Sequence, residues 1–287
     1  FGAVSEQVRG DRVPVVVREL GSTMKPFPLA MALEEGLTSR REAFDLSEPL
    51  TIERTAIVDQ EQILGPVGLR EILARSSNIG AARLALRLGG ARQRAYLERL
   101  GLTAPARVEV AFNETPIAPP ARGQRDVAAL GFGYGLAASP AALAGAYTVF
   151  VNEGARVAPT MLLRLEGDRA VETHPVFSPE TTRQMLLYLR AAVAQGTGRA
   201  ADAPGLAVAG KTGTAEIWGG AEGYDSSRNF SSFAGVFPAH APRYVIVLAL
   251  DGVGAGGAGG QVAAPAVART LRRVAPMLGL RVESPAR

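Results

Sequence analysis

The chain has 287 residues, of which 47% are hydrophobic, so it can build the core of one large or two smaller globular domains. Its 31 basic and 27 acidic residues give a net charge of +4 without any continuous basic run, which argues against nucleic-acid binding. The lack of cysteine excludes disulfides, thiol catalysis and cysteine metal sites, and neither His174 nor His240 has a partner at metal-ligand spacing.

The hydrophobic pattern predicts helices through the middle of the chain and strands toward its ends. A β-branched run predicts a first strand over residues 12–19. Helical spacing follows at 22–35, around 69–73, and at 79–88, 92–100, 140–151 and 179–194. Three strands are then predicted at 206–217, 231–237 and 244–251, followed by a closing helix at 262–278. Helices framed by an antiparallel sheet indicate an α+β fold. We expect a single domain over 1–287, with a mainly helical part at about 22–195 and a sheet part at about 205–280.

Lysine is rare in this chain, and both of its occurrences lie in short polar motifs. Of the 31 basic residues only Lys25 and Lys211 are lysines. Arginine stays protonated under all protein conditions, whereas a lysine amine can lose its proton when it is buried or close to other cations. A GC-rich genome would also favour arginine. We interpret the pattern as a requirement for a titrating amine, or a compact charge, at these two positions.

Ser22 and Lys25 can form a nucleophile and its base. A serine in the first turn of the predicted helix lies near unsatisfied N–H groups and the positive end of the helix dipole. Lys25 is three residues further on, which places the two Cβ atoms about 5–6 Å apart on one face. A neutral Lys25 amine could take the Ser22 proton, and burial or the second lysine would keep it neutral. The alternative is a helix N-cap followed by a surface lysine.

The segment Ser76-Ser77-Asn78 allows two interpretations. As a structural element it would be a polar cap between two helices, where serine and asparagine are favoured. As a functional element it would provide Ser76 as a hydroxyl relay and Asn78 as a hydrogen-bonding partner for a substrate amide.

The segment Lys211-Thr212-Gly213-Thr214 also allows two interpretations. It would be an edge strand with a glycine bulge. Alternatively, Lys211 and the hydroxyls of Thr212 and Thr214 would hold a substrate carboxylate, and Gly213 would let the substrate backbone approach closely.

In this order, the three motifs resemble the signature set of penicillin-binding proteins and class A β-lactamases. More narrowly, nearly the whole chain resembles a class B penicillin-binding protein, the monofunctional transpeptidase type. The flanks of the motifs contribute to this resemblance at 19–27, 73–80, 131–140, 196–198, 208–216 and 259–265.

The resemblance implies a role for each matching residue. Ser22 would be the acylated nucleophile and Lys25 its base, while Ser76 would carry the proton to the departing D-alanine and Asn78 would hold the peptide donor. The segment Lys211–Thr214 would bind the terminal carboxylate. The backbone N–H groups of Ser22 and Thr214 would form the oxyanion hole, an arrangement commonly worth ~10²–10³ in rate.

The implied reaction joins a D-Ala-D-Ala stem peptide to an amine on a neighbouring peptidoglycan strand, without a metal or cofactor. β-Lactams would mimic the donor and trap Ser22 as an ester. The resemblance also implies a domain outside the cytoplasmic membrane, anchored to it in the full-length protein beside a glycan polymerase and divisome proteins. The flanks at 19–20, 215–216 and 242–244 favour the septal type over the elongation type.

The family's fold normally begins with two sheet strands before the nucleophile helix, whereas about twenty residues precede Ser22 here. The expected sheet can therefore be without the family's first two strands. Three alternative functions remain open. A serine β-lactamase of class A would need a further glutamate, which the sequence does not locate. A β-lactam sensor would stay acylated, and a scaffolding pseudoenzyme would be expected to have lost a catalytic residue.

Overall fold

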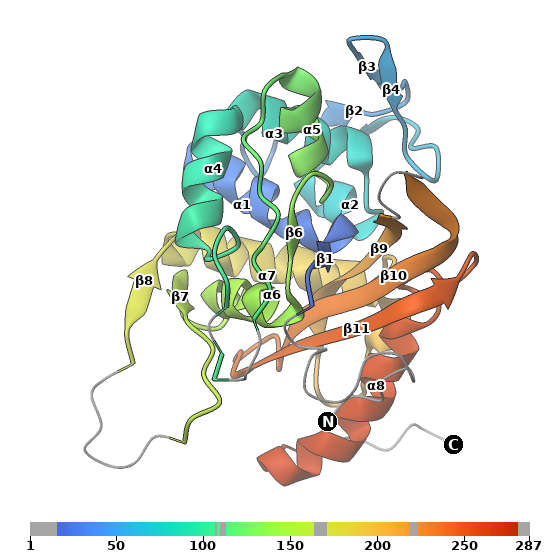
Figure 1. Ribbon diagram of the computed structural model, residues 1–287. Helices are drawn as coiled ribbons and strands as arrows, with labels where there is room; N and C mark the ends of the chain where they lie inside the picture. The colour runs from blue at the N-terminus through green and yellow to red at the C-terminus, as the bar shows by residue number, and fades with distance from the viewer. Residues whose placement is uncertain (1–15, 107, 110–112, 164–170, 219–222, 281–287) are drawn as a thin grey trace.

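The computed structural model describes residues 16–106, 108–109, 113–163, 171–218 and 223–280 (Figure 1). Its first half contains, in chain order, β1 (Arg18–Glu19), the 3₁₀ turn η2 (Gly21–Met24), α1 (Pro26–Glu34), β2 (Phe44–Asp45), β3 (Leu50–Ile52), β4 (Thr55–Ile57), β5 (Pro66–Val67), α2 (Leu69–Ala74), α3 (Asn78–Leu88) and α4 (Gly90–Arg99). The remainder contains α5 (Gln124–Leu130), β6 (Ala137–Ala138), α6 (Pro140–Tyr147), η3 (Thr148–Phe150), β7 (Ala155–Val157), β8 (Thr173–Pro175), α7 (Pro179–Ala194), η4 (Arg199–Ala201), β9 (Ala209–Trp218), β10 (Tyr224–Phe237), β11 (Tyr244–Gly254), α8 (Ala263–Val274) and η6 (Ala275–Leu278).

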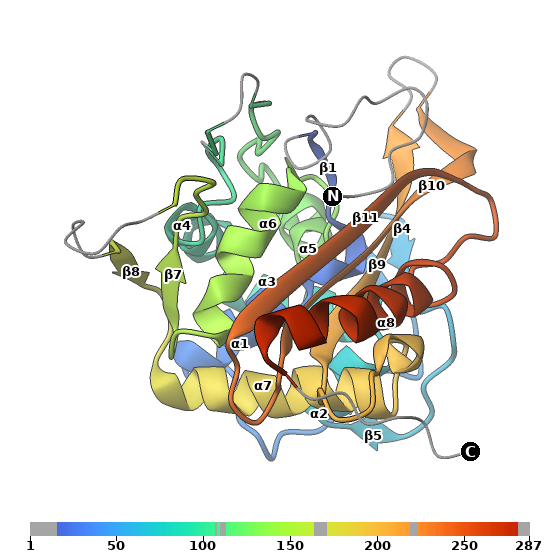
Figure 2. The same ribbon diagram turned by 90° about the horizontal axis from the view of Figure 1, so that it is seen from below.

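The main sheet is antiparallel, in the order β11-β10-β9, and helices cover both of its faces. Helices α6 and α7 pack on one face and α8 packs on the other, as Figure 2 shows. Side chains of β10 alternate between these layers: Ala234 and Val236 join the larger core, whereas Phe233 and Phe237 join the core beneath α8. This arrangement confirms the predicted α+β class.

Helix α1 lies at the centre of the larger core. It directly follows η2, which carries Ser22 and is called the nucleophile turn below. The helix begins with proline, which has no backbone N–H. The first N–H of a helix has no partner within that helix, so proline is favoured at this position. Phe27 has no exposed surface and packs edge-to-face on Tyr147, with ring centroids 5.4 Å apart. It also stacks on Phe150, with centroids 6.0 Å apart. Packing of this aromatic cluster supports the turn that carries Ser22.

The first predicted strand, over residues 12–19, is confirmed only at its end. Residues 12–15 lie outside the described part of the chain, and β1 covers only Arg18–Glu19. It pairs with β6 instead of the main sheet. Arg18 instead bridges to Asp251 of β11 at 2.6 Å through its side chain. The described main sheet thus has three strands.

Other predicted boundaries shift modestly. The helix predicted at 22–35 divides into η2 and α1, and β10 begins at Tyr224 rather than at residue 231. Helix α5 and the short strands β2 to β5 were not predicted. The predicted hairpin between β10 and β11 is confirmed, with Phe237 paired to Tyr244. Helix α7 coincides with its predicted range, and Ser178 caps it by accepting from the Thr181 N–H.

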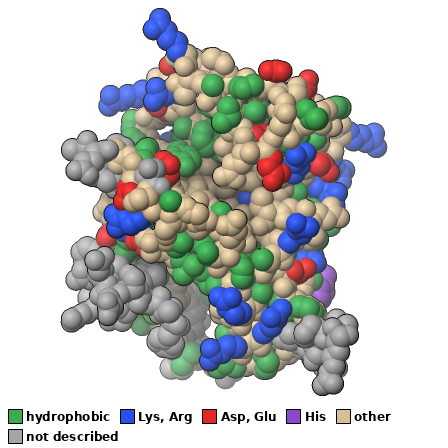
Figure 3. Space-filling view, turned by 90° about the vertical axis from the view of Figure 1, so that its right-hand side faces the viewer, with side chains coloured by type: hydrophobic (Ala, Val, Ile, Leu, Met, Phe, Trp, Pro, Cys, Tyr) green, Lys and Arg blue, Asp and Glu red, His purple; other side chains and the backbone are tan. Residues whose placement is uncertain are grey.

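Helix α8 is amphipathic and closes the lower side of the sheet. Val267 and Leu271 are buried against the strands, while Arg269, Arg272 and Arg273 are exposed. Figure 3 shows the side of the molecule on which basic side chains gather in the lower part, at the height of α8. Basic and acidic side chains are mixed above them. Within the described part of the chain, no helix combines the length and apolar character needed to cross a bilayer.

Replacing Phe27 with alanine should lower the free energy of unfolding by about 3–5 kcal/mol, because the side chain is fully buried among aromatic rings. The matched control is Leu187→Ala on α7, where the side chain is 64% exposed. The control should change stability by less than about 0.5 kcal/mol. Urea unfolding of both variants measures the difference, and equal losses would contradict the assigned core.

Candidate active site

The three motifs meet at one cleft of about 370 Å³ between β9, the nucleophile turn and the junction of α2 with α3. The described residues that line it are Ser22, Gln60, Ser76, Gly196, Thr197, Arg199, Ala200, Thr212, Thr214, Ala258, Gly260 and Gln261. Segments more than fifty residues apart in sequence, such as those of Ser22 and Ser76, thus converge on one site.

Ser22 lies in the turn η2, which is held against its neighbours on several sides. The buried Tyr147 hydroxyl donates to the Thr23 carbonyl at 2.8 Å, and the Thr23 hydroxyl donates to the Leu20 carbonyl at 2.6 Å. Gly21 has a φ of +52°, and a Cβ atom there would lie 2.7 Å from the Thr214 carbonyl oxygen. Glycine is therefore needed for the backbone before Ser22 to rest directly on Thr214.

The Lys25 amine is buried, with 1% exposure, and has three partners on the second motif. It lies 2.7 Å from Asn78 Oδ1, 3.0 Å from Ser76 Oγ and 2.5 Å from the Ser76 carbonyl oxygen. The Asn78 amide orientation is set because its Nδ2 donates to the Val58 carbonyl at 3.0 Å. Asn78 Oδ1 and the Ser76 carbonyl can only accept. A neutral amine would satisfy both with its two N–H groups and keep its lone pair for the Ser76 hydroxyl.

Ser76 connects Lys25 to Ser22. Its Oγ lies 3.1 Å from Ser22 Oγ and 3.0 Å from Lys25 Nζ. Among the described contacts of Lys25, its connection to Ser22 runs through Ser76 and is not direct. Each hydroxyl can both donate and accept, so this chain can carry a proton from Ser22 to Lys25. The structure thus brings the predicted nucleophile and base together through a bridging serine.

Ser76 adopts a backbone conformation that disfavours it. Its φ is +61°, at the position after the end of α2 where glycine is usually found. The Ser77 N–H donates back to the Ile72 carbonyl, as in a Schellman helix end. Ser77 itself caps α3 by accepting from the Gly80 N–H, which confirms the structural interpretation of this segment. A strained non-glycine residue in a cleft points to a functional use of its side chain.

The electrostatic setting favours a neutral Lys25. Burial holds the pKa of Lys25 well below its usual value, and the positive charge of Lys211 lowers this pKa further. Asp59 acts in the opposite direction and raises it. Burial also lowers the pKa of Lys211, to about 7. Both lysines therefore differ from the arginines in the way the sequence pattern indicated.

Lys211 and Thr212 share a partner, Thr197, on the segment after α7. Lys211 Nζ lies 3.2 Å from Thr197 Oγ1 and 3.1 Å from the Thr212 carbonyl oxygen. The Thr212 hydroxyl donates to Thr197 Oγ1 at 2.9 Å. The Thr197 N–H in turn donates to the Ala74 carbonyl, two residues before the second motif. A cation and two hydroxyls thus gather beside the nucleophile, which suits an anionic group.

Glycine is needed at position 213 for a different structural reason from the predicted one. Its pairing with Ser232 is regular, so the predicted bulge is wrong. A Cβ atom at Gly213 would lie 2.5 Å from Ser232 Oγ and 3.0 Å from the Leu20 carbonyl oxygen, both within the protein. Glycine is therefore needed here for β9 to pack against the nucleophile turn. The neighbouring Thr214 Oγ1 accepts from the Gly259 N–H at 2.9 Å, which connects β9 to the segment between β11 and α8.

Comparison with known sequences agrees with this geometry. The family profile described as the penicillin binding protein transpeptidase domain matches residues 16–272. The chain belongs to this family. It is 37% identical to the probable peptidoglycan D,D-transpeptidase FtsI of Caulobacter vibrioides, over 98% of this chain and 50% of that protein. It is 31% identical to the penicillin-binding protein PbpB of Mycobacterium tuberculosis, over 86% of this chain and 39% of that protein. The chain thus spans half or less of the length of these relatives.

Solved structures show the same fold. The transpeptidase domain of Burkholderia pseudomallei penicillin-binding protein 3 superposes with a TM-score of 0.88 at 29% identity, covering 96% of this chain and 84% of that one. Penicillin-binding protein 3 of Mycobacterium tuberculosis, solved in complex with aztreonam, gives a TM-score of 0.83 at 28% identity, covering 96% and 66% of the two chains. The predicted resemblance and fold class are confirmed.

Two residues of this transpeptidase domain were missed as site residues. Thr197 belongs to a glycine-flanked stretch that contributed to the resemblance without being assigned a role. Asp59 accepts hydrogen bonds from the second motif, although it lies eighteen residues before Ser77. No local pattern marks Asp59, because its partners are brought to it only by the fold.

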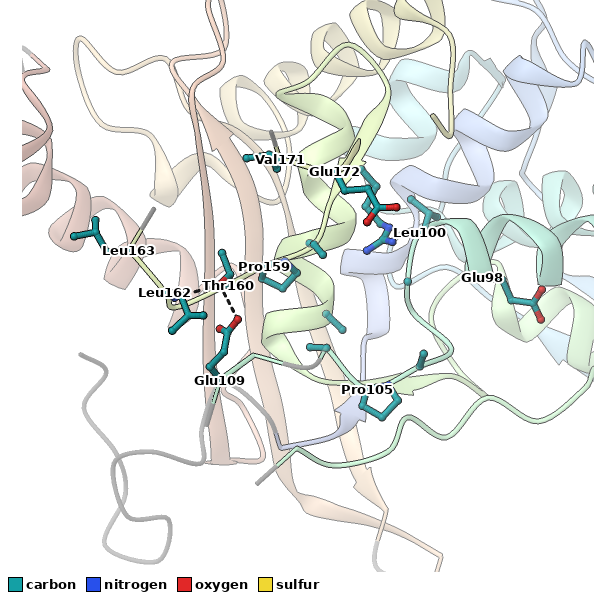
Figure 4. Close-up of a pocket in the computed structure, with 17 residues that line it drawn as sticks. Glu98, Leu100, Pro105, Glu109, Pro159, Thr160, Leu162, Leu163, Val171 and Glu172 are labelled. Atoms are coloured by element: carbon teal, nitrogen blue, oxygen red, sulfur yellow. Dashed lines mark hydrogen bonds between the residues drawn. The ribbon is translucent and has the colours of Figure 1, made fainter. Parts of the chain in front are cut away.

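A larger cleft of about 640 Å³ lies elsewhere, between α6, residues 104–106 with Glu109, and the segment at 158–163 (Figure 4). Its lining includes the exposed Leu162 and Leu163, and Glu109 bonds to Thr160 at its rim. The described lining contains none of the motif residues and no lysine. Size alone therefore does not select the candidate site, since the residues of the three motifs line the smaller cleft.

The strain at Ser76 can be measured by comparing two substitutions that both remove its hydroxyl. Ser76→Gly should be more stable to unfolding than Ser76→Ala by about 1 kcal/mol, because only glycine adopts a φ of +61° freely. Urea denaturation gives the difference. The same pair at Ser47, which lacks a positive φ, should show glycine no more stable than alanine. An alanine variant at Ser76 as stable as the glycine variant would disprove the strain.

Proposed function

We propose that this domain is a serine D,D-transpeptidase that cross-links peptidoglycan stem peptides through an acyl-enzyme on Ser22. The main support for this proposal is the series of hydrogen bonds Ser22–Ser76–Lys25, since it joins a nucleophile to a buried amine whose pKa is lowered. The names of its relatives as D,D-transpeptidases support it.

In the acylation step, Ser22 Oγ bonds to the carbonyl carbon of the terminal D-Ala-D-Ala peptide bond. Its proton passes through the Ser76 hydroxyl to the neutral Lys25 amine. The C–N bond then breaks, and the proton returns through Ser76 to the amine of the departing D-alanine. Ser22 remains as an ester of the shortened stem peptide. An acceptor amine attacks the carbonyl carbon of this ester and forms the C–N bond of the cross-link. The C–O bond to Ser22 breaks, and the proton lost by the amine restores the Ser22 hydroxyl.

Substrate binding would use the opposite wall of the cleft. The terminal carboxylate would be held by Lys211 and the hydroxyls of Thr212 and Thr214, and Thr197 would complete this set. The backbone N–H groups of Ser22 and Thr214 would bind the developing oxyanion. The close approach of Gly21 to Thr214 supports this pairing, because it brings the two backbone segments together. Asn78 would hold the donor peptide.

The cleft favours a long-lived acyl-enzyme over hydrolysis. Class A β-lactamases activate the deacylating water with an additional glutamate. Among the described residues, the lining of this cleft contains no carboxylate. A transpeptidase therefore fits better than a β-lactamase. The complex of a relative with aztreonam supports β-lactam binding as well.

The cellular setting follows from the family. We infer that the domain works on the outer side of the bacterial cytoplasmic membrane, held there by an anchor elsewhere in the full-length protein. A septal role, beside a membrane glycan polymerase and divisome proteins, is supported by the flanks of the motifs and by the similarity to the FtsI-named protein. Recovery of the native protein in a cytosolic fraction would refute this location.

Incubation with a penicillin should give a stable mass increase of one ligand per chain, located on Ser22. Intact-mass measurement and peptide mapping test this, with Ser22→Ala as the unreactive variant. Drug hydrolysis is followed in parallel, and a single stoichiometric burst is expected. Steady rapid turnover would indicate a β-lactamase instead, while a folded protein with neither adduct nor turnover would refute the proposal.

The two lysines should respond differently to arginine. Lys25→Arg should slow acylation by ~10³ or more, because a guanidinium does not release its proton to act as a base. Lys211→Arg keeps a cation that can pair with a carboxylate and should lose clearly less. Second-order acylation rates with one fluorescent penicillin give the comparison, and circular dichroism checks that both variants fold. Near wild-type acylation by Lys25→Arg would show that Lys25 is not the base.

A further inference from the structure

Asp59 lies outside the three motifs, on the segment that follows the β3–β4 hairpin, yet it is bound to the second motif. Its Oδ2 accepts from the Ser77 hydroxyl at 2.6 Å. Its Oδ1 accepts from the backbone N–H groups of Asn78 and Ile79, at 2.5 Å and 3.0 Å. These are the first amides of α3, which no carbonyl of that helix can reach. A carboxylate from a separate segment therefore caps the helix that begins at the catalytic turn.

The same segment also orients the Asn78 side chain. The Val58 carbonyl accepts from Asn78 Nδ2, which leaves Asn78 Oδ1 directed at Lys25 Nζ, 2.7 Å away. Two consecutive residues of this segment thus fix the backbone and the side chain of Asn78. Lys25 draws its partners from Ser76 and Asn78, so its position depends on this anchoring.

Two charged groups act on Lys25 within the described structure. Lys211 from β9 lowers the pKa of Lys25, in addition to the effect of burial, and Asp59 raises it. The two groups come from different elements, Lys211 from the sheet and Asp59 from the segment before α2. A base must be neutral at the working pH yet retain enough affinity for a proton. Burial and Lys211 provide the first property, and Asp59 favours the second.

We propose that Asp59 is a positioning residue for the acyl transfer, which orders the turn Ser76–Asn78 and places its negative charge behind the residues that hold the Lys25 amine. This inference rests on the proposed transpeptidase function. It assigns the segment between β4 and β5 a part in the reaction, although its described contact with the chemistry is indirect. Asp59 acts through Ser77, Asn78 and Lys25 rather than on the substrate.

The test is Asp59→Asn, which can keep the hydrogen bonds while removing the charge. Asparagine Oδ1 can still accept from both backbone amides, and its Nδ2 can donate to Ser77 Oγ. Loss of the negative charge destabilises the ammonium form of Lys25, so the Lys25 pKa falls. The acidic limb of the acylation rate should therefore move to lower pH. The rate at the plateau should fall several-fold, because the base is weaker.

The matched control is Glu61→Gln, two residues along the same segment. Glu61 is 84% exposed and lies 4.0 Å from Arg75, so its charge is screened by solvent. Its pH profile should superpose on that of the wild type. Asp59→Ser is a second neutral replacement that retains an acceptor, should Asp59→Asn fail to fold. A purely structural role would lower the rate at every pH without moving the limb.

A direct readout is possible because the chain has only two lysines. Protein labelled with ¹³C at lysine Cε should give two side-chain signals, assigned with Lys211→Arg, and their titration reports each pKa without any substrate. A wild-type chain that is not acylated by penicillin would overturn the proposed function. A wild-type chain that is acylated, with the same Lys25 titration as a folded neutral variant at Asp59, would overturn the role of Asp59 alone.

Discussion

The burial of the Lys25 amine is the constraint on which the rest of the site depends. A buried amine must have its hydrogen bonds satisfied, and Lys25 finds its partners on Ser76 and Asn78. These residues lie at the junction of two helices, so the bonds join α1 to α2 and α3. The junction must then take the one conformation that presents a carbonyl, a hydroxyl and an amide oxygen together.

That conformation places a serine where the helix end favours glycine. A glycine at position 76 would relax the backbone but would interrupt the path from Ser22 to Lys25. The strained Ser76 is retained because Asp59 and Ser77 hold the following helix from its outer side, and the Lys25 bonds hold the turn from its inner side. Strain, capping and burial are therefore parts of a single arrangement, and each supports the geometry that the others need.

The parts of the fold that follow from local pattern could be predicted. Helix α7 and the β10–β11 hairpin have long apolar repeats. The predicted range of α7 and the predicted connection between the two strands match those observed, although β10 begins seven residues earlier than predicted. Helix α5 has seven residues, and β2 to β5 have two or three each, which is too short for a periodic signal. The motif residues could be found because their order is distinctive. The positive φ of Ser76, the capping by Asp59 and the packing behind Gly213 could not, because they depend on contacts between distant segments.

The contrast between two lysines and many arginines now has a physical basis. Both lysine amines are buried in one region, and a permanently charged arginine would have a different effect at each position. At Lys25 a guanidinium would keep its proton and could not accept one from Ser76. At Lys211 the lowered pKa, about 7, lets the side chain exist in both forms near neutral pH, so a bound carboxylate would favour the charged one. Carboxylate binding would then also offset the field of Lys211 on Lys25, which links recognition of the substrate terminus to the strength of the base.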